Sequence, residues 1–163
     1  MPRLAQWIGL ALLVTVLDQI SKAIIASHFA FGESIRVTSF FDLVLAHNTG
    51  AAFSFLAGAG GWQRWFFTAI ALVAVVVIVY FLRKHVDEPR FCFALSLILG
   101  GALGNLIDRV ALGHVVDFLL FHYEGHAWPA FNVADSAITV GAVLLAWESL
   151  RTKPRNTLPR QRT

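Results

Sequence analysis

The sequence predicts an all-α membrane protein with four transmembrane helices, a small outward-facing β-sheet and an interfacial helical or loop segment. Three observations support this prediction. Of the 163 residues, 57% are hydrophobic and 14% are charged, whereas a soluble domain carries about 25% charged residues. The mean hydropathy is +0.66. Four apolar runs, taken with their flanks, are long enough to cross a bilayer, which needs about 17–25 residues.

We expect these spans at about residues 5–28, 63–82, 91–111 and 129–150, within one integral-membrane domain over residues 1–151. The first apolar run, Leu4–Leu17, resembles the core of a signal peptide. No clear small-residue cleavage site follows it, and the helical pattern continues past Asp18, so we expect a span instead. The second run is uncharged over Trp65–Leu82, and the fourth contains one charge, Asp135.

Basic residues predict the orientation, because short cytoplasmic loops collect Lys and Arg. Arg3 precedes the first span, and Arg83, Lys84 and Arg90 bracket the loop between the second and third. The tail at 152–163 is also basic, which suits an anchor to anionic lipid better than a nucleic-acid contact. We therefore expect both termini in the cytoplasm, membrane lipid as a partner and no nucleic-acid partner.

The two longer connections should then face outward. The first, at about residues 32–60, contains the alternating stretches Ile35–Thr38 and Phe41–Leu45, which predict two or three short β-strands ending in a turn at Asn48–Gly50. The second runs from Leu112 to Pro129. We interpret it as a helix extension followed by an interfacial loop, with Gly113 allowing the chain to bend back.

Polar side chains on three spans fall at one depth. At 1.5 Å per residue, Asp18, Asn105 and Asp135 each lie roughly 22–24 Å from the nearest cytoplasmic basic residue. Each belongs to a set at i, i+3, i+4 on one helix face, and these sets are Asp18, Ser21 and Lys22; Asn105, Asp108 and Arg109; and Asn132, Asp135 and Ser136. Because lipid penalises such faces, we expect them to share a polar interior.

Asp117 and Asp135 are the strongest catalytic candidates. Neither has a basic residue one helical turn away, so their burial needs another explanation. Two carboxyls that differ in ionisation can divide the work of a general base and a general acid. Intramembrane aspartates also serve as relays in proton- or ion-coupled carriers, and that alternative, like a non-enzymatic membrane scaffold, stays open from the residues alone.

The remaining polar residues have structural alternatives. Asp18 and Lys22 suit a supporting pair between helices, and Asp108 and Arg109 could simply neutralise each other's cost through neighbouring helices. Arg109 could equally bind a carbonyl or a lipid head group. Asn105 and Asn132 could form hydrogen bonds between helices, or they could donate hydrogen bonds to a peptide backbone. Asn48 could be only a turn residue.

Other chemistries have little support. Three histidines, His114, His122 and His126, lie near Asp117, and the spacing from His114 to Asp117 fits one helical face, but no HExxH pattern is present. No GxSxG motif supports a serine hydrolase. The lone cysteine, Cys92, lies between two phenylalanines and suits a buried position. We expect neither a metal nor a cofactor.

Five separated motifs, in order along nearly the whole chain, resemble the lipoprotein signal peptidase (signal peptidase II) family. They are Asp18-Gln19-Ile20-Ser21-Lys22, Asn48-Thr49-Gly50-Ala51-Ala52-Phe53-Ser54, the run Gly100–Arg109, Gly113-His114-Val115-Val116-Asp117-Phe118 and the run Phe131–Ile138. The resemblance implies an intramembrane aspartic endopeptidase of the bacterial inner membrane. It implies cleavage of diacylglyceryl-modified prolipoproteins just before the lipidated cysteine, near the outer leaflet, and inhibition by globomycin-type peptides.

The resemblance also implies roles for residues at the matching positions. The catalytic pair falls on Asp117 and Asp135. Substrate-binding positions fall on Asn48, Gly50, Asn105, Arg109 and Asn132, and supporting positions on Asp18, Lys22 and Asp108. We expect a monomer. The loop Phe121–Pro129 matches no motif and is assigned no role.

Overall fold

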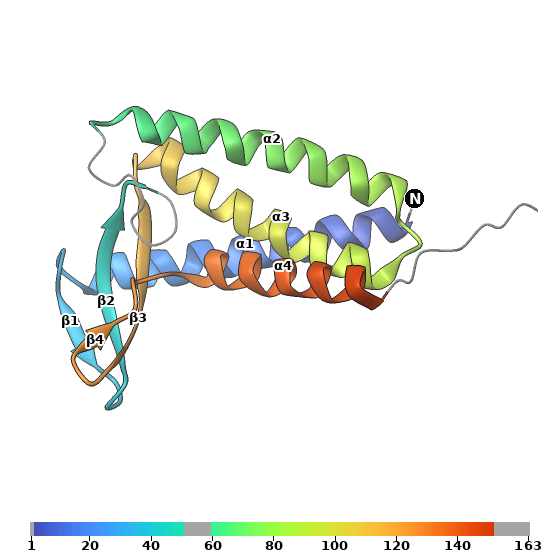
Figure 1. Cartoon of the computed structure of the whole chain (residues 1–163). Helices are drawn as coiled ribbons and strands as arrows, with labels where there is room; N and C mark the ends of the chain where they lie inside the picture. The colour runs from blue at the N-terminus through green and yellow to red at the C-terminus, as the bar shows by residue number, and fades with distance from the viewer. Residues whose placement is uncertain (1, 51–59, 152–163) are drawn as a thin grey trace, which may run out of the picture.

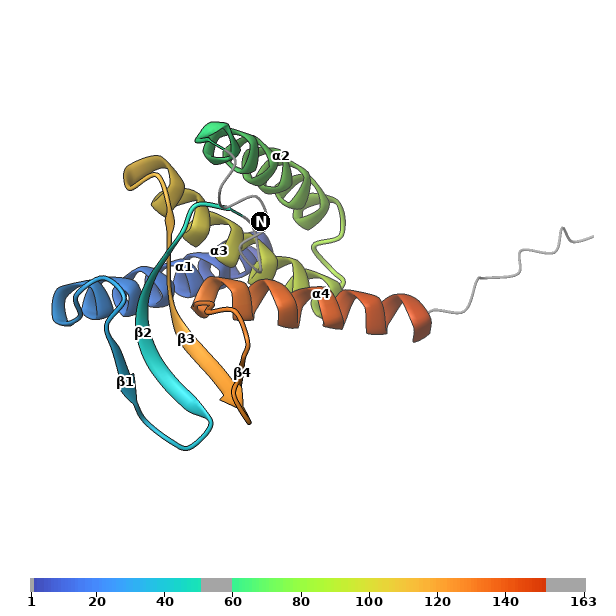
Figure 2. The ribbon, with the colours of Figure 1, turned by 60° about the vertical axis from the view of Figure 1, so that its left-hand side comes forward.

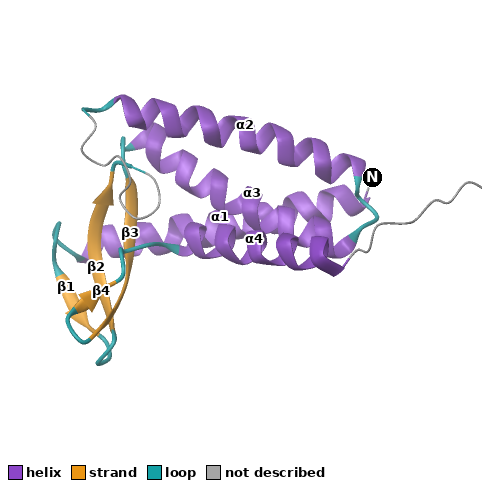
Figure 3. Cartoon of the chain, viewed as in Figure 1, coloured by secondary structure: helices purple, strands orange, loops and turns teal. Residues whose placement is uncertain are grey.

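The structure, a computed structural model, describes residues 2–50 and 60–151. Its four helices are α1 (Pro2–His28), α2 (Trp62–Lys84), α3 (Pro89–Ala111) and α4 (Val133–Arg151), and all four are long and apolar enough to cross a membrane. A small sheet lies at one end of the helix bundle, and the N-terminus and the end of α4 lie at the other (Figures 1 and 3). The predicted fold class is confirmed. The motif residues Ala51–Ser54 and the basic tail lie outside the described residues.

Helix α3 is central and packs against α1, α2 and α4. Glycines make these contacts close. A Cβ at Gly100 would lie 2.5 Å from the Ala11 carbonyl oxygen, and one at Gly101 would lie 2.4 Å from that of Ala134. Gly100 and Gly101 therefore serve close packing of α3 against α1 and α4.

The sheet contains β1 (Ser34–Arg36), β2 (Phe41–Asn48), β3 (Val115–Tyr123) and β4 (His126–Ala127). The strands lie in the order β1-β2-β3-β4, with every neighbouring pair antiparallel (Figure 2). A register shift between Leu43 and Ala46 interrupts the β2–β3 ladder. The sheet packs on the end of α1 through a buried cluster of Ile25, Leu45, Val116 and Phe118. This packing fixes β3 against the helix ends.

The expected helix extension after residue 112 is wrong. Helix α3 ends at Ala111, and Gly113 has a φ of +85°, a left-handed value that reverses the chain as predicted. Arg64 donates to the backbone carbonyls of Arg109 and Val110, which satisfies the end of α3. The following segment, Val115–Tyr123, is rich in β-branched and aromatic residues and forms the longest strand. The expected strands at residues 35–38 and 41–45 correspond to β1 and β2.

Candidate functional site

The structure brings Asp117 and Asp135 to one site from two elements. Asp117 is the third residue of β3 and is 2% exposed. Asp135 lies in the first turn of α4 and is partly buried. Asp117 accepts hydrogen bonds from the side-chain amides of Asn132, at 2.7 Å, and Asn48, at 3.0 Å. Asp135 accepts one from the side-chain amide of Asn105, at 2.8 Å.

Asn132 links the two aspartates. It precedes α4, and its side-chain oxygen accepts the backbone N–H of Asp135 at 2.9 Å, in the manner of an N-cap residue. Its side-chain nitrogen donates to Asp117 and also lies 3.2 Å from the side-chain oxygen of Asn105. Asn132 is completely buried. One residue therefore sets the position of the α4 end that carries Asp135 and of the carboxyl group of Asp117.

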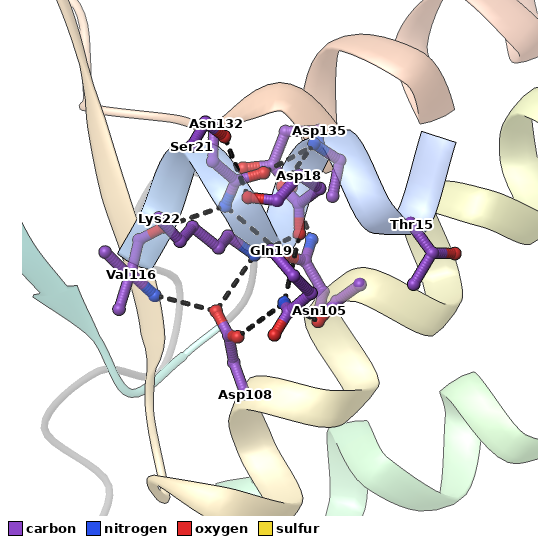
Figure 4. A network of polar contacts seen from close by, with 12 residues as sticks. Thr15, Asp18, Gln19, Ser21, Lys22, Asn105, Asp108, Val116, Asn132 and Asp135 are labelled. Atoms are coloured by element: carbon purple, nitrogen blue, oxygen red, sulfur yellow. Dashed lines mark hydrogen bonds and ion pairs between the residues drawn. The ribbon is translucent and has the colours of Figure 1, made fainter. Parts of the chain in front are cut away.

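Lys22 is the centre of a buried polar network that reaches Asp135 through Asn105 (Figure 4). Its ammonium lies 2.8 Å from Asp18 Oδ2 and 2.9 Å from Asp108 Oδ2, and it donates to Asn105 Oδ1 at 2.9 Å. Its side chain is 4% exposed. All three ammonium protons therefore have acceptors. The pairing of Asp18 with Lys22 agrees with the structural alternative considered from the sequence.

The two carboxylates of this network also hold backbone groups. Asp18 Oδ1 accepts the backbone N–H of Ala134 in the first turn of α4, and Asp108 Oδ2 accepts that of Val116 in β3. Through these two carboxylates, Lys22 connects α1 and α3 to the residues that directly precede Asp135 and Asp117. The charge of Asp108 is thus compensated by Lys22 of α1, and not through the neighbouring Arg109 that the sequence analysis considered.

Sequence reasoning missed Gln19 as a site residue. Its side-chain amide donates to Asp108 Oδ1 at 2.9 Å and to the Gly104 carbonyl at 3.1 Å, and lies 3.3 Å from Asp18 Oδ2. The available signal was an amide next to Asp18 in an otherwise apolar span. The helical spacing rule did not select it, because position i+1 falls off the face that carries Lys22.

Arg109, four residues after Asn105 on α3, contacts Gly50 at the end of the first described segment. Its guanidinium donates to the Gly50 carbonyl at 2.9 Å and sits 5.6 Å from the centre of the Phe67 ring. Gly50 in turn donates its backbone N–H to the side-chain oxygen of Asn48. Among residues 2–50 and 60–151, no acceptor meets the buried Nε of Arg109.

Burial and charge shift the titration of Asp117. Burial, followed by the negative charge of Asp135, raises the pKa of Asp117 to about 7, against the opposing effect of the Asn48 and Asn132 hydrogen bonds and of Lys22. A protonated and an ionised carboxyl can therefore coexist at this site near neutral pH.

A groove of about 390 Å³ opens beside Asp135. Its walls are mainly apolar, and they come from the segment that leads into α4 and from α4 itself. The lining residues include Asn48, Trp128, Phe131, Asp135, Thr139 and Val140. An elongated apolar ligand with a polar group could lie here with that group next to the carboxyls.

The histidines near Asp117 have other neighbours. The His114 ring stacks on His47, with ring centres 3.9 Å apart, and His122 lies 3.0 Å from Asp42. The shared helical face expected for His114 and Asp117 is wrong, because α3 ends at Ala111, His114 precedes β3 and Asp117 is the third residue of that strand. Within the described ranges, no three His, Cys, Asp or Glu residues group as a metal site would require.

Comparison with known proteins gives one consistent family. The family model described as signal peptidase (SPase) II matches residues 10–151. The chain is 61% identical over 148 residues to a lipoprotein signal peptidase of Paraburkholderia phytofirmans, covering 91% of this chain and 86% of that protein. It is 62% identical over 145 residues to a lipoprotein signal peptidase of Cupriavidus necator, covering 89% of this chain and 83% of that protein.

Two solved structures share the fold. Each is described as a bacterial membrane enzyme determined by the in meso method. The first, at 2.3 Å resolution, matches with a TM-score of 0.83 and 34% identity over 98% of this chain and 95% of its own. The second, at 1.9 Å, matches with a TM-score of 0.79 and 36% identity over 91% and 95%.

Proposed function

Because the chain belongs to the signal peptidase II family of bacterial membrane peptidases, we propose that Asp117 and Asp135 are the catalytic carboxyls with which it cleaves prolipoproteins. The observation that carries this proposal is the contact of Asn132 with both aspartates, through its amide nitrogen and its amide oxygen. Family membership favours an aspartic-type peptidase over the carrier and the scaffold that the buried carboxylates alone left open.

In the resting enzyme the shared proton resides on Asp117 and Asp135 is ionised. The pKa of Asp117, raised to about 7, supports this distribution. The position of Asp135 in the first turn of α4 supports it as well, because the positive end of a helix dipole stabilises a negative charge there. Asp135 then acts as the general base and Asp117 as the general acid.

The reaction proceeds in two steps. Asp135 accepts a proton from water while the water oxygen bonds to the scissile carbonyl carbon, which forms a tetrahedral intermediate. The intermediate collapses as the C–N bond breaks, and Asp117 gives its proton to the leaving nitrogen. Asp135 then holds the proton taken from water, and its transfer to Asp117 restores the resting state. No covalent enzyme intermediate forms.

The neighbouring donors hold the substrate. The guanidinium of Arg109, which donates to the Gly50 carbonyl, binds the peptide backbone of the substrate, and the amide of Asn48 holds Asp117 at the point of attack. Apolar side chains of the groove, including Phe131 and Val140, contact the substrate beside Asp135. Fixing the scissile carbonyl between two carboxyls lowers the entropic cost of the reaction.

The orientation predicted from the basic residues supports a site at the outer leaflet. The basic ends of α1, α2 and α4 face the cytoplasm, so the sheet and the aspartates lie at the outer leaflet of the bacterial membrane. A diacylglyceryl-cysteine anchored in that leaflet holds the preceding peptide bond at this depth. Globomycin-type peptides compete for the same groove, and the enzyme acts as a monomer.

Two single variants test the proposal. Asp117→Asn and Asp135→Asn, each purified in detergent and assayed on a lipidated prolipoprotein, should lose roughly 10²–10⁴-fold in kcat/KM, the usual contribution of a positioned acid or base. Asp42→Asn, which changes a carboxyl on β2 that pairs with His122, is the matched control and should keep near-normal turnover. Near-normal cleavage by either of the first two variants would exclude the assignment.

A further inference from the structure

A second groove lies at the other end of the bundle, away from both aspartates. It has a volume of about 520 Å³, within the range of roughly 300–1,000 Å³ common for small-molecule sites. Helices α1, α3 and α4 supply its walls, with Trp7, Phe93, Leu144 and Trp147 as the main apolar side chains. It lies at the end of the bundle that carries the N-terminus and the end of α4 (Figure 1).

Two arginines stand at the rim of this groove. Arg90 belongs to the first turn of α3, its side chain is 76% exposed, and its Nη1 lies 4.0 Å from Glu148 Oε2. Arg151 ends α4, and its guanidinium lies 5.4 Å from the centre of the Trp147 ring. Glu148 is the one acidic residue among the described lining residues, so the rim has a net charge of +1. An anionic group is therefore favoured there.

The apolar walls and the basic rim together favour a ligand that has both an apolar part and an anionic group. The Trp7 ring is held by an N–H donated to the Val86 carbonyl at 3.3 Å, and tryptophans at such positions mark the boundary between hydrocarbon and head groups. The four-helix bundle spans a membrane, so the groove opens to acyl chains at its apolar side and to head groups at its basic rim. The sequence after Arg151 adds four basic residues and no acidic one.

We propose that this groove binds an anionic phospholipid of the leaflet opposite the sheet, with its phosphate between Arg90 and Arg151 and an acyl chain against Phe93 and Leu144. Basic pockets between transmembrane helices recognise such head groups, because each nearby Lys or Arg attracts the anionic lipid. A free phosphate would use only the rim and make no contact with the apolar walls. This site is independent of the catalytic proposal, since none of its residues touches Asp117 or Asp135.

The test is native mass spectrometry of the full chain released from detergent that contains equal amounts of phosphatidylglycerol and phosphatidylcholine. The wild type should retain phosphatidylglycerol preferentially. The double variant Arg90→Gln/Arg151→Gln should lose about fivefold in affinity for each guanidinium removed. The matched control Arg83→Gln/Lys84→Gln removes two exposed charges from the end of α2, outside the groove, and should retain the lipid.

Further arms separate the other occupants. Glu148→Gln should bind phosphatidylglycerol more tightly than the wild type, and glycerol phosphate should not displace the bound lipid. Equal retention of the two lipids by the wild type, or equal loss of phosphatidylglycerol in the Arg90/Arg151 variant and the control, would overturn the proposal. So would a dimer that disappears in the Arg90/Arg151 variant, because the groove would then be an interface with a second copy.

Discussion

Replacing Lys22 with methionine should strongly destabilise the fold, because Lys22 neutralises two buried carboxylates. Its ammonium lies within 2.9 Å of Asp18 and of Asp108, whose side chains are 0% and 4% exposed. Methionine has a similar length and no charge, so the substitution leaves those two carboxylates without a cation. Removing one partner of a buried ion pair costs about 3–5 kcal/mol.

This cost predicts a large change in thermal stability. For a chain of this size, each kcal/mol shifts the midpoint of unfolding by about 2–4 °C, so Lys22→Met should lower Tm by roughly 6–20 °C in detergent. The double variant Lys22→Met/Asp108→Asn removes one of the stranded charges and should recover about half of the loss. The control Lys84→Met removes an exposed lysine and should stay within about 0.5 kcal/mol of the wild type.

The same variant should also change the pH dependence of cleavage. Lys22 lowers the pKa of Asp117, so its removal should raise that pKa and move the alkaline limb of activity to higher pH. The measurements are a thermal scan by intrinsic fluorescence and kcat/KM across pH. A Tm for Lys22→Met within 2 °C of the control would refute the reasoning, because it would mean that the three charges do not depend on one another.

Three further outcomes are expected. The wild-type kcat/KM should follow a bell-shaped pH profile whose alkaline limb lies near pH 7 rather than near pH 4. Asp117 must hold its proton, and it loses that proton as the pH rises through its pKa of about 7. A flat profile up to pH 9 would exclude Asp117 as the acid. Gly104→Ala should cost about 1–3 kcal/mol, because the new Cβ would lie 2.4 Å from Asp18 Oδ2. Gly9→Ala, with nothing within 4 Å of the new Cβ, should be neutral or stabilise α1 by up to about 1 kcal/mol in the same thermal scan. Asn132→Ala should cost about 1 kcal/mol through the lost N-cap and should reduce kcat/KM because both aspartates lose the side chain that positions them. It should also move the alkaline limb to higher pH, because Asp117 loses a hydrogen bond that lowers its pKa; unchanged kinetics would contradict its link to the aspartates.

Much of the fold could be predicted from the sequence because the membrane imposes simple rules. Helix length and hydrophobicity located the four spans, and the expected position 91–111 differs from α3, Pro89–Ala111, by only two residues at one end. Counting rise per residue placed Asp18, Asn105 and Asp135 at one depth, and the structure connects them through Lys22 and hydrogen bonds. These features depend on local periodicity, which a single sequence displays directly.

The segment after α3 could not be predicted in the same way. Val115–Tyr123 forms a strand because it pairs with β2, whose residues lie 67 to 80 positions earlier, from Asn48↔Val115 to Phe41↔Phe121, and that pairing is not visible in local periodicity. The prediction that His114 and Asp117 share a helical face failed for the same reason, because no helix continues beyond Ala111 at this point. Gln19 was missed for a related reason, because its contacts with Asp108 and Gly104 depend on how closely α1 and α3 approach.

The most direct test of the catalytic pair compares four proteins, namely the wild type, Asp117→Asn, Asp135→Asn and the variant that carries both changes. Each is assayed for kcat/KM on the same lipidated prolipoprotein after thermal scans confirm that it is folded. If the two carboxyls act as one acid–base unit, either single change should cost nearly as much as both together. Losses that multiply, or a single variant that still cleaves at a near-normal rate, would contradict the account.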